Sequence, residues 1–149
     1  MAKNILNKHV HKALEWINEI NDSLEWDSQA YALDALRAVL HQLRDNLPMV
    51  EAVHLGAQFP LIIRGIYFEE WRPSQVPFKQ KQKEHFIESV RNNLERYIKK
   101  SFEDEDIEFI IRTVFQTLAS HIDDGESGKL LRVLPLGIAD FIADEMSKL

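Results

Sequence analysis

Glu51 and His54 form the first pair whose residue types and spacing suit chemistry. In a helix, positions i and i+3 share one face, and di-iron bundle proteins use glutamate–histidine pairs at this spacing as metal ligands. Such sites need two of these pairs and two further glutamates. At the corresponding place 75 positions later, Glu126 is followed by Lys129, and a charged lysine has no lone pair for a metal. We therefore expect no metal site, and we interpret Glu51 as a carboxylate favoured near a helix N-terminus.

A glycine-containing stretch, residues 125–129, resembles the end of a phosphate-binding loop. The full pattern needs glycine in place of Asp123, Ser or Thr in place of Leu130, and a preceding strand, and all three are missing. The histidines include no pair at i and i+4, and no serine occupies a strand-to-helix elbow. The chain has no cysteine, which excludes thiolate catalysis, disulfides and cysteine-based zinc sites. We therefore predict no catalytic residue and no cofactor, and we favour a protein that is not an enzyme.

The segment from Ile63 to Pro73 contains residue types that are enriched at binding hot spots. Its candidates for a binding surface are Arg64, Tyr67, Phe68, Trp71 and Arg72. If a helix runs through the segment, Arg64, Tyr67 and Trp71 share one face, with Phe68 beside them. Arg72 would follow at the helix end, where the dipole favours a cation that can reach an anionic partner. The corresponding residues 138–146 keep the apolar positions but lack Arg, Tyr and Trp, so we hypothesise that the fold does not require these side chains.

A structural role is the alternative for the same segment. Tyr67 and Trp71 would then pack beneath the connector that follows, and Gly65 would let a neighbouring helix approach closely. Burial distinguishes the two hypotheses. Partial exposure of Tyr67 and Trp71 indicates a surface for a partner or ligand, whereas burial of both beneath residues 73–77 indicates packing.

Apolar residues at helical spacing place these candidates on a series of helices. The stripe between His9 and Ile20 predicts a first helix, and a leucine seam predicts a second from about Ser28 to Asn46. Pro48 suits the start of a third helix, which stops at Pro60 because a residue before proline is driven out of the helical region. A fourth piece follows from Leu61 to about Glu70. No segment alternates with period two, so we predict no strands.

The second half of the chain repeats these signals. Capping patterns begin at Ser101 and Asp123, and Leu134-Pro135 repeats the proline break. Residues 111–142 match residues 36–67 without a gap, and eight of 32 positions are identical, against about two expected from ordinary residue usage. The identical pairs are Arg37/Arg112, Val39/Val114, Leu43/Leu118, Glu51/Glu126, Leu55/Leu130, Pro60/Pro135, Leu61/Leu136 and Ile63/Ile138.

Such self-similarity is typical of a repeated supersecondary unit that cannot bury its apolar face alone. We therefore predict an all-α fold in which two pseudo-symmetric three-helix repeats pack into one six-helix domain, with the third helix of each repeat broken at proline. The predicted single domain spans residues 1–149, with repeat one at 1–72, a connector at 73–78 and repeat two at 79–149.

The charge of the chain limits its partners. Its 18 Lys and Arg stand against 24 Asp and Glu, and a net charge of −6 argues against a general polyanion-binding protein. The basic stretch Lys79–Lys100 precedes acidic residues 103–106, an order that helix dipoles explain. The N-terminal residues 1–8 have no long apolar core, so we expect no signal peptide, no membrane span and a cytoplasmic protein.

Several of these motifs together resemble a known family. The stretch 35–40, Phe59-Pro60 with Ile63 to Tyr67, and Trp71-Arg72-Pro73 are similar to the bacterial family catalogued as domain of unknown function 2267. Gly125-Glu126 and Leu134-Pro135 match it as well. The resemblance implies a small, duplicated, all-helical domain with no assigned activity and no catalytic residue to transfer. The chain departs from the pattern at residues 48–51, where a Gly-Glu pair would resemble the second copy better.

These observations favour a non-enzymatic protein-interaction or scaffold module. Its partner would be another protein, or a second copy of the chain in a homo-oligomer. The alternative is a small-molecule-binding protein or enzyme with a site between the repeats near Arg64, Tyr67 and Trp71. A second alternative is nucleic-acid contact through the basic helix Lys79–Lys100.

Overall fold

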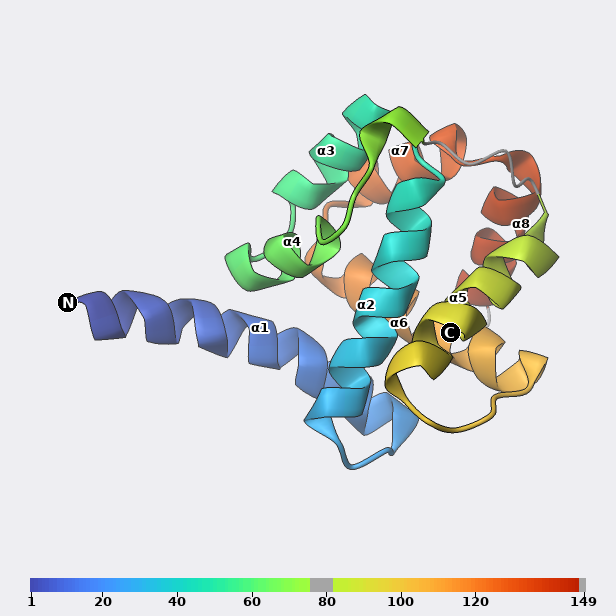
Figure 1. Cartoon of the computed structure of the whole chain (residues 1–149). Coiled ribbons are helices and arrows are strands. Elements are labelled where there is room, and N and C mark those ends of the chain that lie inside the picture. Colours follow the sequence, from blue (N-terminus) through green and yellow to red (C-terminus); the bar gives the residue numbers. More distant parts are fainter. Residues whose placement is uncertain (76–81, 148–149) are drawn as a thin grey trace.

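The computed structural model describes residues 1–75 and 82–147, and α-helices make up most of this part of the chain (Figure 1). The elements are α1 (Ala2–Leu24), α2 (Gln29–Asp45), α3 (Met49–Ala57), α4 (Leu61–Tyr67), the 3-10 turn η1 (Pro73–Gln75), α5 (Lys83–Tyr97), α6 (Asp104–His121), α7 (Asp124–Val133) and α8 (Leu136–Met146). The described residues contain no β-strand, which confirms the predicted all-α class. Residues 76–81, which comprise the end of the predicted connector at 73–78 and the start of predicted repeat two, lie outside the described residues.

The first helix is longer than its predicted core, whereas the second begins and ends where its signals indicate. α1 starts seven residues before His9 and continues to Leu24, where Glu25 adopts a left-handed conformation with φ 56°. The Ser28 hydroxyl caps α2 by accepting a hydrogen bond from the backbone N–H of Tyr31 at 3.2 Å. Asn46 closes α2 at its C-terminal end. Local capping chemistry therefore sets the boundaries of α2.

Prolines separate the short helices. Pro48, Pro60 and Pro135 stand directly before α3, α4 and α8, with φ values between −52° and −56°. The described residues therefore form eight α-helices, where the sequence predicted six with two of them broken. A proline suits such a position because its ring fixes φ and its missing N–H has no partner in the first helical turn.

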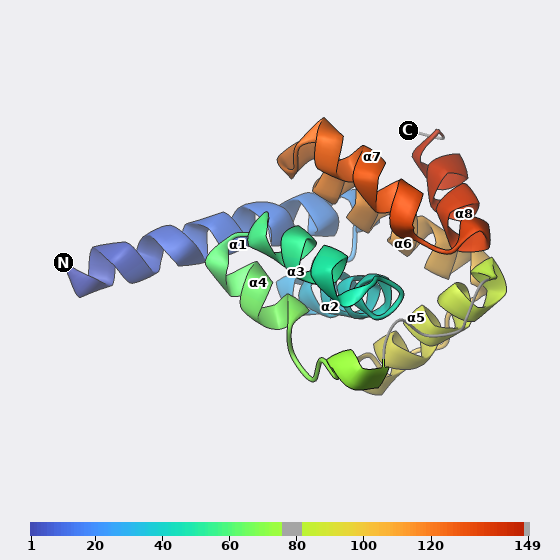
Figure 2. The same cartoon turned by 90° about the horizontal axis from the view of Figure 1, so that it is seen from above.

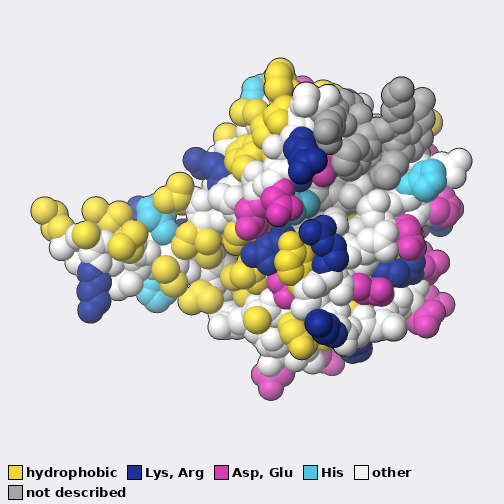
Figure 3. Space-filling model, viewed as in Figure 1, with side chains coloured by type: hydrophobic (Ala, Val, Ile, Leu, Met, Phe, Trp, Pro, Cys, Tyr) yellow, Lys and Arg dark blue, Asp and Glu magenta, His cyan; other side chains and the backbone are white. Residues whose placement is uncertain are grey.

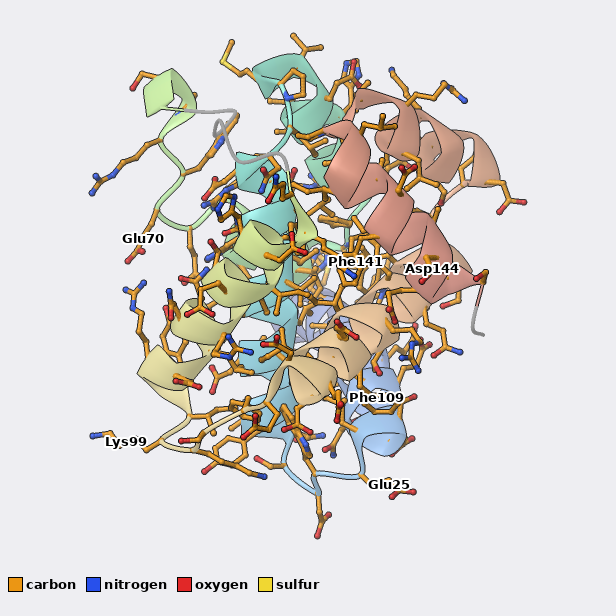
Figure 4. The ribbon with its side chains drawn as sticks, turned by 90° about the vertical axis from the view of Figure 1, so that its right-hand side faces the viewer. Glu25, Glu70, Lys99, Phe109, Phe141 and Asp144 are labelled. Carbon is orange, nitrogen blue, oxygen red and sulfur yellow. The ribbon has the colours of Figure 1, made fainter. Side chains whose placement is uncertain are left out.

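The fourth helix is shorter than predicted, since α4 ends at Tyr67 rather than near Glu70. The guanidinium of the buried Arg44 on α2 donates hydrogen bonds to the backbone oxygens of Tyr67 at 2.8 Å and Glu69 at 2.6 Å. These carbonyls are therefore satisfied without a further helical turn. Glu70 adopts φ 57° at an exposed turn, which Figure 4 shows beyond the helices.

The α6 cap also differs from its predicted position. Glu103, not Ser101, caps α6 in a reciprocal arrangement with Asp106, whose carboxylate accepts from the Glu103 backbone N–H at 3.0 Å. Asp123 caps α7 as predicted and accepts from the Gly125 N–H at 2.7 Å. The helix dipole favours an acidic residue at the N-cap. The sequence pattern therefore allowed both Ser101 and Glu103 as the cap of α6.

One contiguous core joins the helices. It contains the leucine seams of α2 and α6, so Leu43 and Leu118 belong to the same cluster. α2 packs against α1, α4, α5 and α6, while α3 lies beside α7 (Figure 2). From α8, Phe141 points into the interior, whereas Asp144 lies at the outer surface (Figure 4). The N-terminal half of α1 extends away from this core in both ribbon views.

Candidate interaction surface

The aromatic residues of the predicted site pack against one another, with Tyr67 buried and Phe68 and Trp71 partly exposed. Tyr67 is 0% exposed, and its hydroxyl donates a hydrogen bond to the backbone oxygen of Ala52 at 2.7 Å. Its ring lies edge-on to Phe59 at 5.0 Å and to Phe68 at 4.8 Å between centroids, and Phe68 contacts Trp71 at 5.3 Å. Burial raises the pKa of Tyr67, because the phenolate form would lose its hydration. Tyr67 therefore packs inside the fold and is not part of a surface.

Arg64 faces a different direction. Its guanidinium donates to the backbone oxygens of Gly56 at 3.1 Å, Ala57 at 3.3 Å and Phe59 at 3.1 Å. The Gly56 and Ala57 carbonyls lie at the C-terminal end of α3, and Phe59 lies in the turn that follows it. The Gly56 oxygen also accepts from the Phe59 backbone N–H at 3.1 Å. A cation at this end is also favoured by the dipole of α3. Arg64 therefore caps α3 from the first turns of α4.

Arg72 lies at a third place, in a hollow between α2 and α5 with a volume of about 260 Å³. Arg96 and Tyr97 of α5 and Arg37 of α2 also line this hollow. Arg37 is held by Asp34 at 2.9 Å and by Glu69 at 3.0 Å. The predicted common face of Arg64, Tyr67 and Trp71 required a helix through the segment, but α4 ends at Tyr67 and Trp71 lies beyond it. Gly65 also has no neighbour within 4 Å of an added Cβ, so no helix approaches closely there.

His41 lies beside the same hollow and is the titratable group there with a shifted pKa. Its Nε2 is 2.6 Å from the backbone oxygen of Ile66, so the neutral ring donates a hydrogen bond from this nitrogen. Burial lowers the pKa of His41, and the charge of Arg44 acts in the same direction. Glu69, at 3.9 Å, opposes the shift. His41 is therefore stabilised in its neutral form.

The N-terminal half of α1 exposes an apolar stripe, and the predicted stripe included only its part from His9 onward. Ile5 is 58% exposed, Leu6 64% and Val10 45%. Leu6 and Val10 continue, at spacings of four and three, the stripe that buries Ala13 and Ile17 further along the same helix, and Ile5 is adjacent to Leu6 in the sequence. Hydrophobic side chains cover this projecting helix in Figure 3, interspersed with cations and histidine. The periodicity before His9 was the signal that could have identified this surface.

A hollow of about 510 Å³ lies where α1 meets the α3–α4 turn and the end of α6. Lys8, Lys12 and Trp16 line it from α1, and Phe59, Pro60, Leu61 and Arg64 line it from the α3–α4 turn and α4. His121 closes it from α6, with its ring stacked on Trp16 at 4.8 Å between centroids and its Nε2 2.8 Å from a Glu19 oxygen. Ile5, Leu6 and Val10 do not line this hollow. We use the name α1 groove for the hollow and this exposed stripe of the same helix together.

The α1 groove is cationic in a chain of net negative charge. The first twelve residues contain Lys3, Lys8 and Lys12 and no acidic residue. Lys12 is paired with Glu15 at 3.6 Å, but both side chains are more than half exposed, so this pair is weak. Apolar side chains flanked by lysines suit an acidic amphipathic segment.

Glu51 and His54, the candidate metal-binding pair, have separate surroundings in the structure. A Glu51 carboxylate oxygen lies 3.5 Å from Lys129 Nζ, so this ion pair joins α3 to α7, while His54 is exposed. Within residues 1–75 and 82–147, no group of three His, Asp or Glu side chains is placed to hold a metal ion. Glu51 therefore has an electrostatic role between two short helices.

The basic stretch of α5 is partly neutralised by its neighbours. Arg91 forms ion pairs with Glu88 and with Asp104 in the first turn of α6, and its Nε donates to the backbone oxygen of Phe102 at 3.1 Å. Hydrogen bonding to Asp104 raises the pKa of Arg91 further. Lys79 and Lys81 lie outside the described residues. Arg91 therefore links α5 to α6 in the described part of this stretch.

The fold and these surfaces define a small all-helical protein with an exposed apolar stripe on one half of α1. A family model described as "Uncharacterized conserved protein (DUF2267)" matches residues 13–141. The chain belongs to this family, as the sequence resemblance predicted. Comparison with curated proteins gives no match. Among the described helices, none has the length and apolar content required to cross a bilayer.

Proposed function

We propose that this protein is a non-enzymatic interaction module that binds an acidic amphipathic helix of a protein partner in the α1 groove. The observation that carries the proposal is the apolar stripe of α1, which continues past the core with Ile5, Leu6 and Val10 exposed. An amphipathic helix is stabilised mainly by packing of its apolar face, so an unpacked stripe of this length suits a partner.

The charges around the stripe support an acidic partner over a basic one. Lys3, Lys8 and Lys12 flank the stripe, and Arg64 lines the hollow at its base. A partner helix that places apolar residues on Ile5 and Leu6 would bring its flanking side chains near these cations. Carboxylates there would gain attraction and a faster encounter, whereas lysines would be repelled. A second copy of the chain is the competing occupant.

We infer that the scaffold carrying this groove is a duplicated unit, with α1–α4 equivalent to α5–α8. The helix pairs that pack together support this inference. α1 packs on α2 and α6, and α5 packs on α6 and α2; α4 packs on α1 and α2, and α8 packs on α5 and α6. α2 meets α6, and α3 meets α7. Exchanging each helix of the first unit with its counterpart leaves this set of pairs unchanged, as two-fold pseudo-symmetry requires.

Matched peptides test the proposed groove. Two fluorescent amphipathic helical peptides would share one leucine face and differ only in a polar face of glutamate or lysine. We expect the acidic peptide to bind, the basic peptide not to bind, and the affinity to fall with added salt. Leu6→Glu should abolish binding, whereas the control Leu136→Glu, at a position that is 76% exposed and outside the groove, should not. Equal binding of both peptides, or equal loss in both variants, would contradict the proposal.

Light scattering addresses the competing occupant. A monomer at the concentrations used for peptide binding leaves the groove open for another protein. A dimer that Leu6→Glu dissociates would show that a second copy occupies it. A dimer that persists in this variant uses another surface. The peptide experiment then determines whether the α1 groove binds a protein partner.

A second candidate is a small anionic ligand in the hollow between α2 and α5. These helices belong to different proposed repeats, and the cations Arg72 and Arg96 lie beside Tyr97 there. Titration with inorganic phosphate and with citrate would test this candidate. A rise in melting temperature that Arg72→Ala removes would favour it, and no rise would argue against it.

A further inference from the structure

A pocket between α6, α7 and α8 has no role in the proposed peptide groove. We propose that this pocket is a binding site for a small aromatic molecule bearing a hydroxyl group, that is, a phenol. The proposal rests on the duplication inferred above and goes beyond the peptide-binding function. It is distinct from the α1 groove, because the two share α6 but no lining residue.

The pocket is small and lined almost entirely by apolar side chains. Leu118 and Ile122 of α6 and its end, Leu130 and Leu131 of α7, and Ile142 and Met146 of α8 form its wall, and its volume is about 40 Å³. A single water needs roughly 10–15 Å³, but it also needs polar partners, and an apolar cavity stays dry without them. Ser127 provides the polar edge of this wall. The pocket therefore favours an apolar occupant with one polar atom.

The equivalent space in the first unit shows which occupant fits. In the alignment at 75 positions, Ile142 corresponds to Tyr67 and Ser127 to Ala52. The Tyr67 ring is 0% exposed, and its hydroxyl donates to the Ala52 backbone oxygen at 2.7 Å. In the first unit, a phenol ring therefore fills this space, and its hydroxyl donates to a helix backbone oxygen. In the alignment, the backbone oxygen of Ser127 corresponds to that acceptor.

The second unit has smaller side chains in place of Phe68, which contacts the Tyr67 ring, and of Trp71, which contacts Phe68. Phe68 corresponds to Ala143 and Trp71 to Met146, so methyl and thioether groups replace aromatic rings. Leu131 takes the place of Gly56 and fills only part of the difference, since the pocket remains. Side chains therefore fill this space in the first unit, whereas the equivalent space in the second unit is only partly filled.

Entry of a ring needs one side chain to move. A phenol is larger than the 40 Å³ now open, and Met146 lies on the rim, partly exposed. Methionine has three rotatable side-chain bonds and adapts to new neighbours at low cost. Outward rotation of Met146 would make room for the ring beside Ile142. The bound hydroxyl then donates to the Ser127 backbone oxygen.

The test uses p-cresol, which has the ring and hydroxyl of a tyrosine side chain, and follows backbone amides by NMR. We expect saturable shifts at α6, α7 and α8 with a dissociation constant of about 1 mM, as suits so small a ligand. Toluene, which lacks the hydroxyl, should bind at least several-fold more weakly. No saturable shift, or shifts confined to other helices, would overturn the proposal. Binding by N-acetyltyrosine amide but not by p-cresol would also overturn it, because the site would then recognise a partner's tyrosine.

Two variants separate this site from the duplication on which it rests. Ile142→Tyr should fill the pocket as Tyr67 does, keep the melting temperature and lower p-cresol affinity at least tenfold. Tyr67→Ala should create the matching cavity in the first unit, and p-cresol should restore part of its lost melting temperature. Restoration in Tyr67→Ala with no binding to the wild-type α6–α8 pocket would overturn the proposed site and leave the duplication intact. If Ile142→Tyr fails to fold, Met146→Ala replaces it, with tighter p-cresol binding expected and unchanged or weaker binding counting against the site.

Discussion

Two glycine-to-alanine substitutions should change stability in opposite directions, although both lie in short helices. At Gly56 on α3, an added Cβ would lie 2.6 Å from Phe68 Cζ, 2.8 Å from its Cε2 and 3.0 Å from Tyr67 Cε2. Tyr67 cannot retreat without losing its hydrogen bond to Ala52. At Gly65 on α4, the same Cβ would meet no atom within 4 Å.

The magnitudes follow from packing and helix propensity. Overpacking a filled core costs about 1–3 kcal/mol, whereas alanine gains up to about 1 kcal/mol over glycine inside a helix. Gly56→Ala should therefore lose about 1–2 kcal/mol and lower the melting temperature by roughly 2–8 °C for a chain of this size. Gly65→Ala should gain about 0.5–1 kcal/mol and raise it by roughly 1–4 °C.

Urea unfolding followed by far-ultraviolet circular dichroism measures both changes, with melting curves as a second readout. The paired design controls for the helix-propensity term, since both variants make the same chemical change. If Gly56→Ala is as stable as the wild type or more stable, the rings of Phe68 and Tyr67 do not pack on α3 as described. A loss in Gly65→Ala equal to that in Gly56→Ala would refute the reasoning from local space.

Three further substitutions test individual contacts. Tyr67→Phe should lower the free energy of unfolding by about 1 kcal/mol, because it removes one buried hydrogen bond to Ala52 while keeping the ring; an unchanged value in urea unfolding would contradict this bond. Arg64→Ala should lower it by about 1–2 kcal/mol through loss of the α3 cap, and Arg64→Lys should not restore it, since lysine cannot reach three carbonyls at once. Because burial lowers the pKa of His41 below its ordinary value of 6.5, the unfolded chain takes up a proton there first, so the stability of the wild type should fall as the pH falls below about 6.5. His41→Gln should flatten this dependence in unfolding measured from pH 7 to about 5, and an unaltered slope would exclude His41 as its source.

Helix positions could be read from the sequence where the signal is local. The apolar spacing, the Ser28 and Asp123 caps and the breaks at Pro60 and Pro135 depend only on neighbouring residues, and these features appear where they were expected. The end of α4 could not be predicted in this way. It depends on Arg44, which reaches its carbonyl from 23 positions earlier in the chain.

The candidate site was harder to predict because it also depends on residues that are far apart in the sequence. The residue types of Tyr67 and Trp71 suit a hot spot, but whether a ring faces a partner or a neighbouring helix depends on distant residues. Here Gly56 on α3 leaves the space that the rings of Tyr67 and Phe68 occupy. The α1 groove combines side chains from α1, the α3–α4 turn and α6, and no linear pattern brings these three segments together.

Chemical-shift mapping of the acidic amphipathic peptide on the isotopically labelled protein tests the proposed groove most directly. The account predicts saturable shifts at the amides of residues 5–12 and 59–64, together with the indole N–H of Trp16, which lines the hollow. Leu6→Glu should remove these shifts without changing the rest of the spectrum. Shifts centred on α5 or on the hollow at Arg72, or no saturable shift at all, would contradict the assignment of the α1 groove as the interaction surface.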